Sequence, residues 1–249
     1  MDGKLPIIAL DFATVEELRE FLNLFPKGET LNLKIGMEMY YMNGPELVRE
    51  LVAAGHKLFL DLKLHDIPNT VKRSMAVLAQ LGVSMVNVHA MGGSKMLEAA
   101  KEGLLAGSPS TAGAQAPLLI AVTQLTSTTQ EQVLEEQLSR VSLEESVSQY
   151  AQTTAAAGLD GVVCSPHEVA AIKAKLGQAF LTVTPGIRLA SQAISQDDQH
   201  RIATPESAAA MGSDYIVVGR PITRADKPLA TYRQLTQAWQ AAKTKEENQ

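Results

Sequence analysis

Two carboxylates and a lysine lie within six positions of the segment FLDLKLHDIPNT, residues 59–70. Asp61, Lys63 and Asp66 follow the run 57–60, which has the apolar character of a buried strand. Buried ion pairs stabilise proteins weakly at best, so charges at this position favour a chemical role in electrostatic stabilisation and proton transfer. The alternative is a structural, salt-bridged strand end, because ion pairs of that kind also cluster.

The spacing of these residues predicts that their side chains do not all point to the same face of the strand. Side chains alternate along a strand, so Asp61 and Lys63 are expected on one face. Asp66 has the opposite parity. Either the strand ends near His65, or Asp66 points elsewhere, for example into a neighbouring subunit.

The composition of the chain narrows the classes of protein to which it can belong. Its 249 residues suit one (β/α)8 barrel, although two small domains would also fit. The 45% of hydrophobic residues can build a large core, and the net charge of −5 argues against nucleic acid as a partner. Cys164 is the only cysteine, which excludes an intrachain disulfide, and no apolar run is long enough to span a membrane. We expect a cytoplasmic protein without membrane contact.

Eight short apolar runs alternate with segments of helical periodicity. Most runs are apolar on both faces, which is typical of parallel strands covered by helices. The pattern predicts an α/β fold, a closed (β/α)8 TIM barrel, over an open doubly wound sheet. We expect one domain over residues 1–249 with a frayed tail from about 243. The runs are 6–10, 31–35, 57–64, 85–88, 118–122, 161–164, 180–183 and 215–218.

Two of the intervening helices carry a recognisable start signal. Thr14 precedes one helical stripe and is followed three residues later by Glu17, while Ser142 and Glu145 repeat that spacing. Both pairs predict a capping box.

Polar residues lie in the last part of each of the eight apolar runs or follow it, at the ends where barrel enzymes build their active sites. Solvation alone is a poor explanation for charged or hydroxyl residues at every strand end. We therefore expect these side chains to converge on one rim. They are Asp11, Lys34, Asp61 with Lys63, His89, Thr123 with Thr126, Ser165, Thr184 with Arg188, and Gly219 with Arg220.

The eighth run ends in a candidate phosphate site. Gly219 lets backbone amides approach a ligand, and Arg220 supplies a forked cation. The loops after strands seven and eight are the usual phosphate site of these barrels. The alternative is a turn followed by a surface arginine.

Other chemistries have little support in the sequence. The five histidines show no zinc-ligand spacing. A magnesium site on Asp11 and Asp61 is conceivable, but Lys34 and Lys63 already supply cationic partners. No dinucleotide fingerprint, P-loop or Ser-His-Asp pattern can be placed.

Motifs from about Leu5 to Tyr232 resemble the bacterial orotidine 5′-phosphate decarboxylase family. A wider group of phosphosugar decarboxylases and synthases shares D-x-K-x-x-D. Lys34 is more discriminating, since the magnesium-dependent keto-gulonate-phosphate branch has glutamate there. The resemblance therefore points to the cofactor-free orotidylate branch. The matching segments are LPIIALDF, LKIGMEMYY, FLDLKLHDIPNTV, VNVHAMGG, AVTQLTS, GLDGVVCS, TVTPGIR, DDQHRIATP and YIVVGRPIT.

The resemblance implies a homodimer that converts orotidine 5′-phosphate to uridine 5′-phosphate, with no cofactor or metal. Lys63 would stabilise the C6 carbanion and protonate it, Asp61 would lie near the departing carboxylate, and Lys34 would hold Asp61. Asp66 of the partner subunit would complete this catalytic array. The implied substrate-binding residues are Asp11 and Lys34 for the ribose, Thr126 for the pyrimidine, Ile67 and Thr70 of the partner subunit, and Arg188, Gln199, Gly219 and Arg220 for the phosphate.

Two alternatives remain open from the residues alone. One is a magnesium-dependent keto-gulonate 6-phosphate decarboxylase on the same barrel, against which Lys34 argues. The other is a non-catalytic barrel that binds pyrimidine nucleotides, which has little use for Lys63 between two carboxylates. His65 and His89 are expected to be structural hydrogen-bonding residues.

Overall fold

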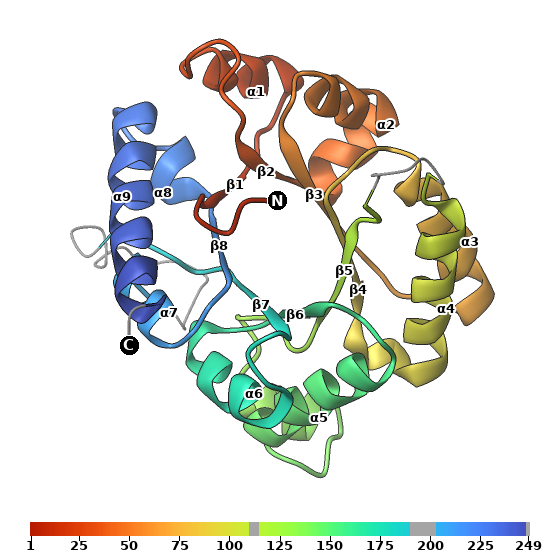
Figure 1. Cartoon of the computed structure of the whole chain (residues 1–249). Helices are drawn as coiled ribbons and strands as arrows, with labels where there is room; N and C mark the ends of the chain where they lie inside the picture. The colour runs from red at the N-terminus through yellow and green to blue at the C-terminus, as the bar shows by residue number, and fades with distance from the viewer. Residues whose placement is uncertain (110–114, 190–202, 248–249) are drawn as a thin grey trace.

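Eight parallel strands close into a barrel in sequence order, and helices surround it (Figure 1). The computed structural model describes residues 1–109, 115–189 and 203–247. This arrangement confirms the predicted (β/α)8 barrel. The strands are β1 (Ile7–Ala9), β2 (Asn32–Gly36), β3 (Lys57–Leu64), β4 (Met85–His89), β5 (Leu118–Val122), β6 (Gly161–Val163), β7 (Leu181–Thr184) and β8 (Tyr215–Val218).

The helices between the strands vary widely in length. Three short single-turn elements, labelled η, follow strand ends or lie within loops. None of the helices in the described ranges combines the length and apolarity needed to cross a bilayer. The elements are α1 (Val15–Leu22), α2 (Met37–Ala53), α3 (Pro68–Ala79), η1 (Ala90–Gly92), α4 (Gly93–Gly107), η2 (Gln132–Glu136), α5 (Leu143–Ala156), η3 (Pro166–Glu168), α6 (Val169–Leu176), α7 (Pro205–Ala210), α8 (Arg220–Thr223) and α9 (Pro228–Glu247).

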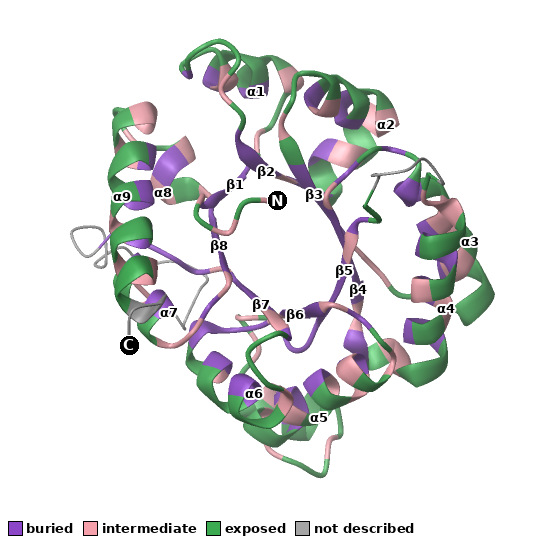
Figure 2. Cartoon of the chain, viewed as in Figure 1, coloured by how far each residue is buried: buried purple, intermediate pink, exposed green. Residues whose placement is uncertain are grey.

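The strands separate two layers of apolar core. In β1, Ile7 and Ala9 join a cluster inside the barrel, while Ile8 joins the layer between strands and helices. This alternation follows from the two-residue period of a strand. Figure 2 shows the strands buried almost throughout, whereas the helices expose their outer faces. Parallel strands buried on both faces are what the continuous apolar runs of the sequence require.

The N-terminal segment closes the end of the barrel where the strands begin. The side-chain amide of Asn32 donates to the carbonyls of Asp2 and Leu5 at 2.7 and 2.9 Å. The indole of Trp239, on α9, donates to the carbonyl of Gly3 at 2.7 Å. These bonds hold the segment across the mouth of the barrel (Figure 1), so the opposite end is the open one.

The capping boxes were predicted with mixed success. Ser142 and Glu145 form the complete reciprocal pair at the start of α5. At α1, the Thr14 hydroxyl accepts from the Glu17 amide at 3.2 Å, but the Glu17 carboxylate accepts from the Ala13 amide instead of the Thr14 amide. The bond from the backbone to the Glu17 carboxylate therefore comes from the residue before the N-cap, and Thr14 is still the N-cap of α1.

Helix α9 runs through Lys243 to Glu247, and the fraying expected from about 243 stays a prediction. The Lys243 ammonium donates to the carbonyl of Ser213 at 3.1 Å and lies 5.6 Å from the ring centroid of Trp239. These contacts tie the last turns of α9 to the barrel.

An ion pair between the buried Lys173 and the half-buried Asp214 joins α6 to the residue before β8, and the sequence patterns did not reveal it. The Lys173 ammonium donates to Asp214 Oδ2 at 2.7 Å and to the carbonyls of Gln178 and Phe180, both at 2.9 Å. Asp214 also accepts from the Thr182 amide at 2.7 Å. Every proton of the ammonium therefore has an acceptor, which is the condition under which a buried charge is tolerated.

Replacing Lys173 should destabilise the barrel strongly. Lys173→Ala removes the ammonium bonded to Asp214, so we expect the free energy of unfolding to fall by about 3–5 kcal/mol. Lys175→Ala on the same helix removes an exposed lysine bonded to Ser148 and should cost less than about 0.5 kcal/mol. Urea denaturation of both variants measures the difference. Equal losses would contradict the role assigned to Lys173.

Candidate active site

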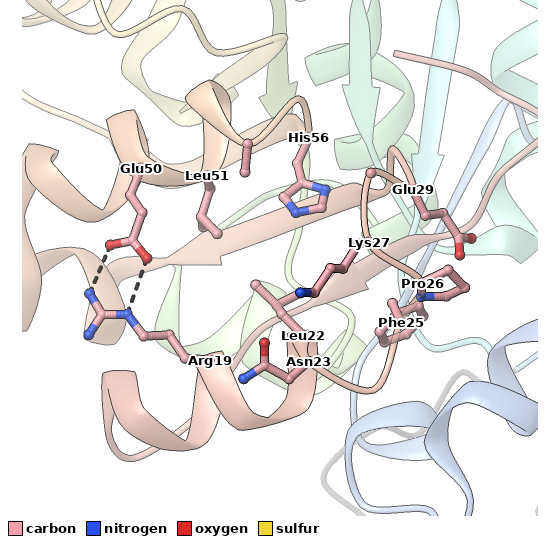
Figure 3. Close-up of a pocket in the computed structure, with 12 residues that line it drawn as sticks. Arg19, Leu22, Asn23, Phe25, Pro26, Lys27, Glu29, Glu50, Leu51 and His56 are labelled. Atoms are coloured by element: carbon pink, nitrogen blue, oxygen red, sulfur yellow. Dashed lines mark hydrogen bonds and ion pairs between the residues drawn. The ribbon is translucent and has the colours of Figure 1, made fainter.

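Two cavities are candidates for the functional site, and we distinguish them by the charged residues that line each one. The larger, about 410 Å³, lies beside α1 and the C-terminal end of α2. Figure 3 shows its edge, where Arg19 and Glu50 pair through two bonds of 2.8 and 3.1 Å and so neutralise one another. The smaller, about 250 Å³, opens at the C-terminal ends of the strands and is lined by Lys34, Asp61 and Lys63. We take the smaller cavity as the candidate active site.

Four charged side chains alternate in sign beside this cavity. The Lys34 ammonium, from the middle of β2, lies 3.4 Å from Asp11 Oδ1 and 3.2 Å from Asp61 Oδ2. Asp61 and Lys63 both lie on β3, and the Lys63 ammonium is 2.7 Å from Asp61 Oδ1. The order is therefore Asp11, Lys34, Asp61, Lys63. The parallel register, which sets Gly36 opposite Asp61, brings the ends of β2 and β3 together.

Burial and pairing shift the pKa values of the central residues in opposite directions. Burial disfavours the charge of Lys34, but the carboxylates of Asp61 and Asp11 outweigh it and raise the pKa of Lys34. Burial alone would raise the pKa of Asp61, yet Lys34, Lys63 and the hydrogen bond from Asn87 hold it below its ordinary value. Both groups thus stay ionised at neutral pH.

The backbone of β3 is irregular where it carries these charges. The pairing of β3 with β4 shifts between Leu60 and Leu64. Lys63 has a φ of +53°, in the left-handed region that residues other than glycine rarely adopt. The strand ends at Leu64, so one of the two explanations for the parity of Asp66, an end near His65, is correct.

Asp66, Ile67 and Thr70 are not brought into the array within one chain. All three are exposed around the start of α3. Asp66 Oδ1 accepts from the amide of Ile67 at 2.7 Å. Among the described residues, no ion pair joins Asp66 to Lys63.

The remaining predicted residues surround the cavity unevenly. Thr126 lines it, together with Pro185 and Val217. Gly219 follows β8 beside Asp11, because a Cβ at Gly219 would lie 3.9 Å from Asp11 Oδ2. Arg220 begins α8 and is exposed, while Arg188 is buried. Gln199 lies outside the residues that the structure describes.

Two residues near the array were missed in the sequence. Asn87, on β4, is 1% exposed and bonds to both Asp61 and Lys63. A polar residue inside the apolar run 85–88 was the available signal. Gly36 leaves room for the first ion pair, since a Cβ there would lie 3.3 Å from Asp11 Oδ1 and 3.4 Å from Lys34 Nζ.

The two histidines near the rim lie side by side. The ring centroids of His65 and His89 are 5.9 Å apart. Burial, followed by the charges of His65 and Lys63, lowers the pKa of His89. Within the described ranges, no cluster of three or more His, Cys, Asp or Glu side chains could hold a metal ion.

The fold and the site together define a (β/α)8-barrel enzyme with an alternating charge array on β2, on β3 and on the segment after β1. Residues 4–235 match the model of the orotidine 5′-phosphate decarboxylase / HUMPS family, so the chain belongs to that family. This result confirms the resemblance seen in its motifs.

Similar proteins cover nearly the whole chain. A Listeria monocytogenes protein named orotidine 5′-phosphate decarboxylase is 58% identical over 236 residues, 95% of this chain and 99% of its own length. A Streptococcus thermophilus protein of the same name is 56% identical over 234 residues, 94% and 96% of the two chains. The crystal structure of orotidine 5′-phosphate decarboxylase from Lactobacillus acidophilus has a TM-score of 0.84 at 42% identity, covering 94% of this chain and 98% of its own.

Removing Lys34 should change the titration of its neighbour. In Lys34→Met, burial still disfavours the Asp61 carboxylate while one of its two cationic partners is gone, so the pKa of Asp61 should rise. A ¹³C NMR titration of the aspartate carboxyl groups measures this change. Lys72→Met, which removes the partner of Glu102, serves as the control and should leave Asp61 unaltered. An unchanged Asp61 titration in Lys34→Met would contradict the electrostatic account.

Proposed function

We propose that the protein decarboxylates orotidine 5′-phosphate to uridine 5′-phosphate, the last step of UMP synthesis, without a cofactor. The observation that carries this proposal is the Asp11–Lys34–Asp61–Lys63 array beside the cavity of about 250 Å³. Membership of the family and the names of its relatives support the same substrate. Lys34 lies between two carboxylates, where it supplies the positive charge that a divalent cation would otherwise bring.

The reaction needs a positive charge at one carbon atom. The bond between C6 and the carboxylate breaks, CO₂ leaves, and the electron pair remains on C6 with no effective sink in the ring. We assign the Lys63 ammonium to stabilise this carbanion and then transfer a proton to C6, after which water restores the proton to the amine. A fixed charge stabilises such an anion more strongly in a site that excludes water.

The neighbours of Lys63 have supporting roles in this proposal. Asp61 lies near the departing carboxylate and keeps the Lys63 ammonium in position through a 2.7 Å contact. Lys34 holds Asp61, and with Asp11 it binds the ribose hydroxyls. Thr126, which also lines the cavity, binds the pyrimidine.

The phosphate takes no part in bond making, so its binding energy serves to orient the substrate. We assign it to Gly219 and Arg220 at the end of β8, with Arg188 beside them and Gln199 as a further contact. The position of Gly219 next to Asp11 is consistent with a ribose bound between the array and this phosphate site.

A homodimer with shared active sites would complete the array. In the proposed dimer, Asp66 of the partner subunit lies next to Lys63, with Ile67 and Thr70 of the partner subunit beside the substrate. Exposed apolar side chains support a contact surface here, because they follow the C-terminal ends of three neighbouring strands. They are Met37, Tyr41 and Met42 after β2, Ile67 after β3 and Met91 after β4.

We also propose that residues 1–249 act as a single barrel domain in the cytoplasm, without a nucleic-acid or membrane partner. The one cysteine, Cys164, is buried and has no cysteine with which to pair in the chain, which suits a reducing compartment. The net charge of −5 leaves no excess of cations for a phosphate backbone.

Ultraviolet absorbance of the protein mixed with orotidine 5′-phosphate and EDTA tests the activity. We expect rapid conversion to uridine 5′-phosphate, and no measurable turnover in Lys63→Ala, because this variant lacks the proton donor. Lys101→Ala, which removes a lysine paired with Asp160 away from the cavity, should keep the wild-type rate. Magnesium-dependent turnover of keto-gulonate 6-phosphate alone, or tight nucleotide binding without turnover, would disprove the proposal.

Mixing inactive variants tests the shared site. A mixed dimer of Lys63→Ala and Asp66→Ala chains contains one site with both residues intact. Random association makes half of the dimers mixed, so about a quarter of the wild-type activity should return. Mixtures of Lys63→Ala with Asp61→Ala should restore nothing, since both residues come from the same strand. If the first mixture also stays inactive, Asp66 does not act across the dimer.

A further inference from the structure

Asn87 lies opposite the irregular part of β3. The two strands pair regularly at Leu60 with Val86 and again at Leu64 with Val88. Residues 61–63 of β3 therefore face a single residue of β4, and that residue is Asn87. Both candidate catalytic residues of β3, Asp61 and Lys63, lie within this bulge.

The Asn87 side chain takes the place of the missing strand-to-strand bonds. Its Oδ1 accepts from the backbone amide of Lys63 at 2.8 Å, and its Nδ2 donates to Asp61 Oδ1 at 2.7 Å. A backbone N–H can only donate, so the orientation of the amide is fixed by this pair of bonds. A buried amide with both functions used is a stable arrangement, whereas either bond left unmade would be costly.

The bond to Lys63 holds a strained backbone. The φ of +53° at Lys63 requires support from its surroundings, because an L side chain is crowded in the left-handed region. The direction of Cα–Cβ at Lys63, and hence the origin of its long side chain, depends on this conformation. The second bond of the amide fixes the carboxylate plane of Asp61, the direct partner of the Lys63 ammonium.

We propose that Asn87 is a positioning residue for decarboxylation, which sets the backbone of Lys63 and the carboxylate of Asp61 through one amide. The proposal rests on the function proposed above. Asn87 need not touch the substrate, and it does not line the cavity. Without it, β3 is expected to leave the strained conformation and carry the Lys63 ammonium away from its place beside Asp61.

Asn87→Ala and Asn32→Ala form a matched pair for the test. Both residues are buried asparagines, on the two strands that flank β3, but Asn32, on β2, bonds to the N-terminal segment at the closed end. We expect kcat to fall about 100-fold in Asn87→Ala with KM changed less than about threefold, because substrate contacts remain while the reacting groups are misplaced. Asn32→Ala should lose stability and keep kcat.

Amide hydrogen exchange supplies a readout that needs no turnover. The Lys63 N–H should exchange faster in Asn87→Ala, since its acceptor is gone, and should keep its protection in Asn32→Ala. If the wild-type protein fails to decarboxylate orotidine 5′-phosphate, the proposed function fails, and this measurement still decides whether Asn87 holds Lys63.

Asn87→Asp tests the hydrogen bond that the Asn87 Nδ2 group donates to Asp61. One carboxyl oxygen can accept from the Lys63 amide, and the other, when protonated, can donate to Asp61 as the amide does. Two carboxylates in contact repel one another, which raises the pKa of one of them, so we expect the pair to hold a proton at low pH and to lose it as the pH rises. The charged and titratable groups around this pair are Lys34 from β2, Lys63 from β3, His89 from β4 and His65 beyond the end of β3.

The ratio of kcat in Asn87→Asp to kcat in the wild type should therefore rise as the pH falls, whereas the ratio for Asn87→Ala should stay flat. A purely structural role predicts no such rescue by acid. The proposal is overturned by an Asn87→Asp ratio as low and flat as that of Asn87→Ala, by equal kcat losses in Asn87→Ala and Asn32→Ala, or by unchanged exchange of the Lys63 amide.

Discussion

The carboxylate of Asp61 is the interaction on which the rest of the site depends. Lys34, Lys63 and Asn87 all bond to it, and they come from three adjacent strands. Without Asp61, two ammonium groups would share a largely buried space, and the carboxylate left to offset them among the described residues of one chain would be Asp11, which is itself mostly exposed. Such an arrangement is unfavourable, because an unpaired buried charge is far more costly than a paired one. The Asp61 carboxylate thus allows two ammonium groups to lie close together at a point where an anionic substrate can bind.

The closed barrel makes this collection possible. Parallel pairing in sequence order brings the ends of β1 to β4 together, although their residues are spread over some eighty positions of the chain. The same topology places the apolar cluster of the barrel interior beneath the array. That cluster keeps water from reaching the charges from below, which strengthens each electrostatic contact. Stability and chemistry therefore occupy opposite ends of the same strands, as is usual for this architecture.

The sequence predicted the barrel and the main charges because both follow from local patterns. Apolar runs indicate parallel strands directly. The two-residue period predicted that Asp61 and Lys63 share a face, and their side chains do meet, although a bulge interrupts the strand between them. Asn87 was not predictable in this way, since its role arises from a bulge in β3 that no residue pattern announces. Lys173 and Asp214 escaped notice for a related reason: they are distant in sequence, and only the packing of α6 against the barrel joins them.

The bond between Trp239 and Gly3 spans 236 positions of the sequence and joins the two ends of the chain. A growing polypeptide can form its early β/α units as they leave the ribosome, but this bond must wait until α9 has been made. The same is true of the ladder between β1 and β8, which closes the sheet. During synthesis the first strand therefore keeps an unpaired edge, which is open to strand pairing with other chains. The barrel is therefore completed late in synthesis, when β8 pairs with β1 and α9 bonds to the N-terminal segment.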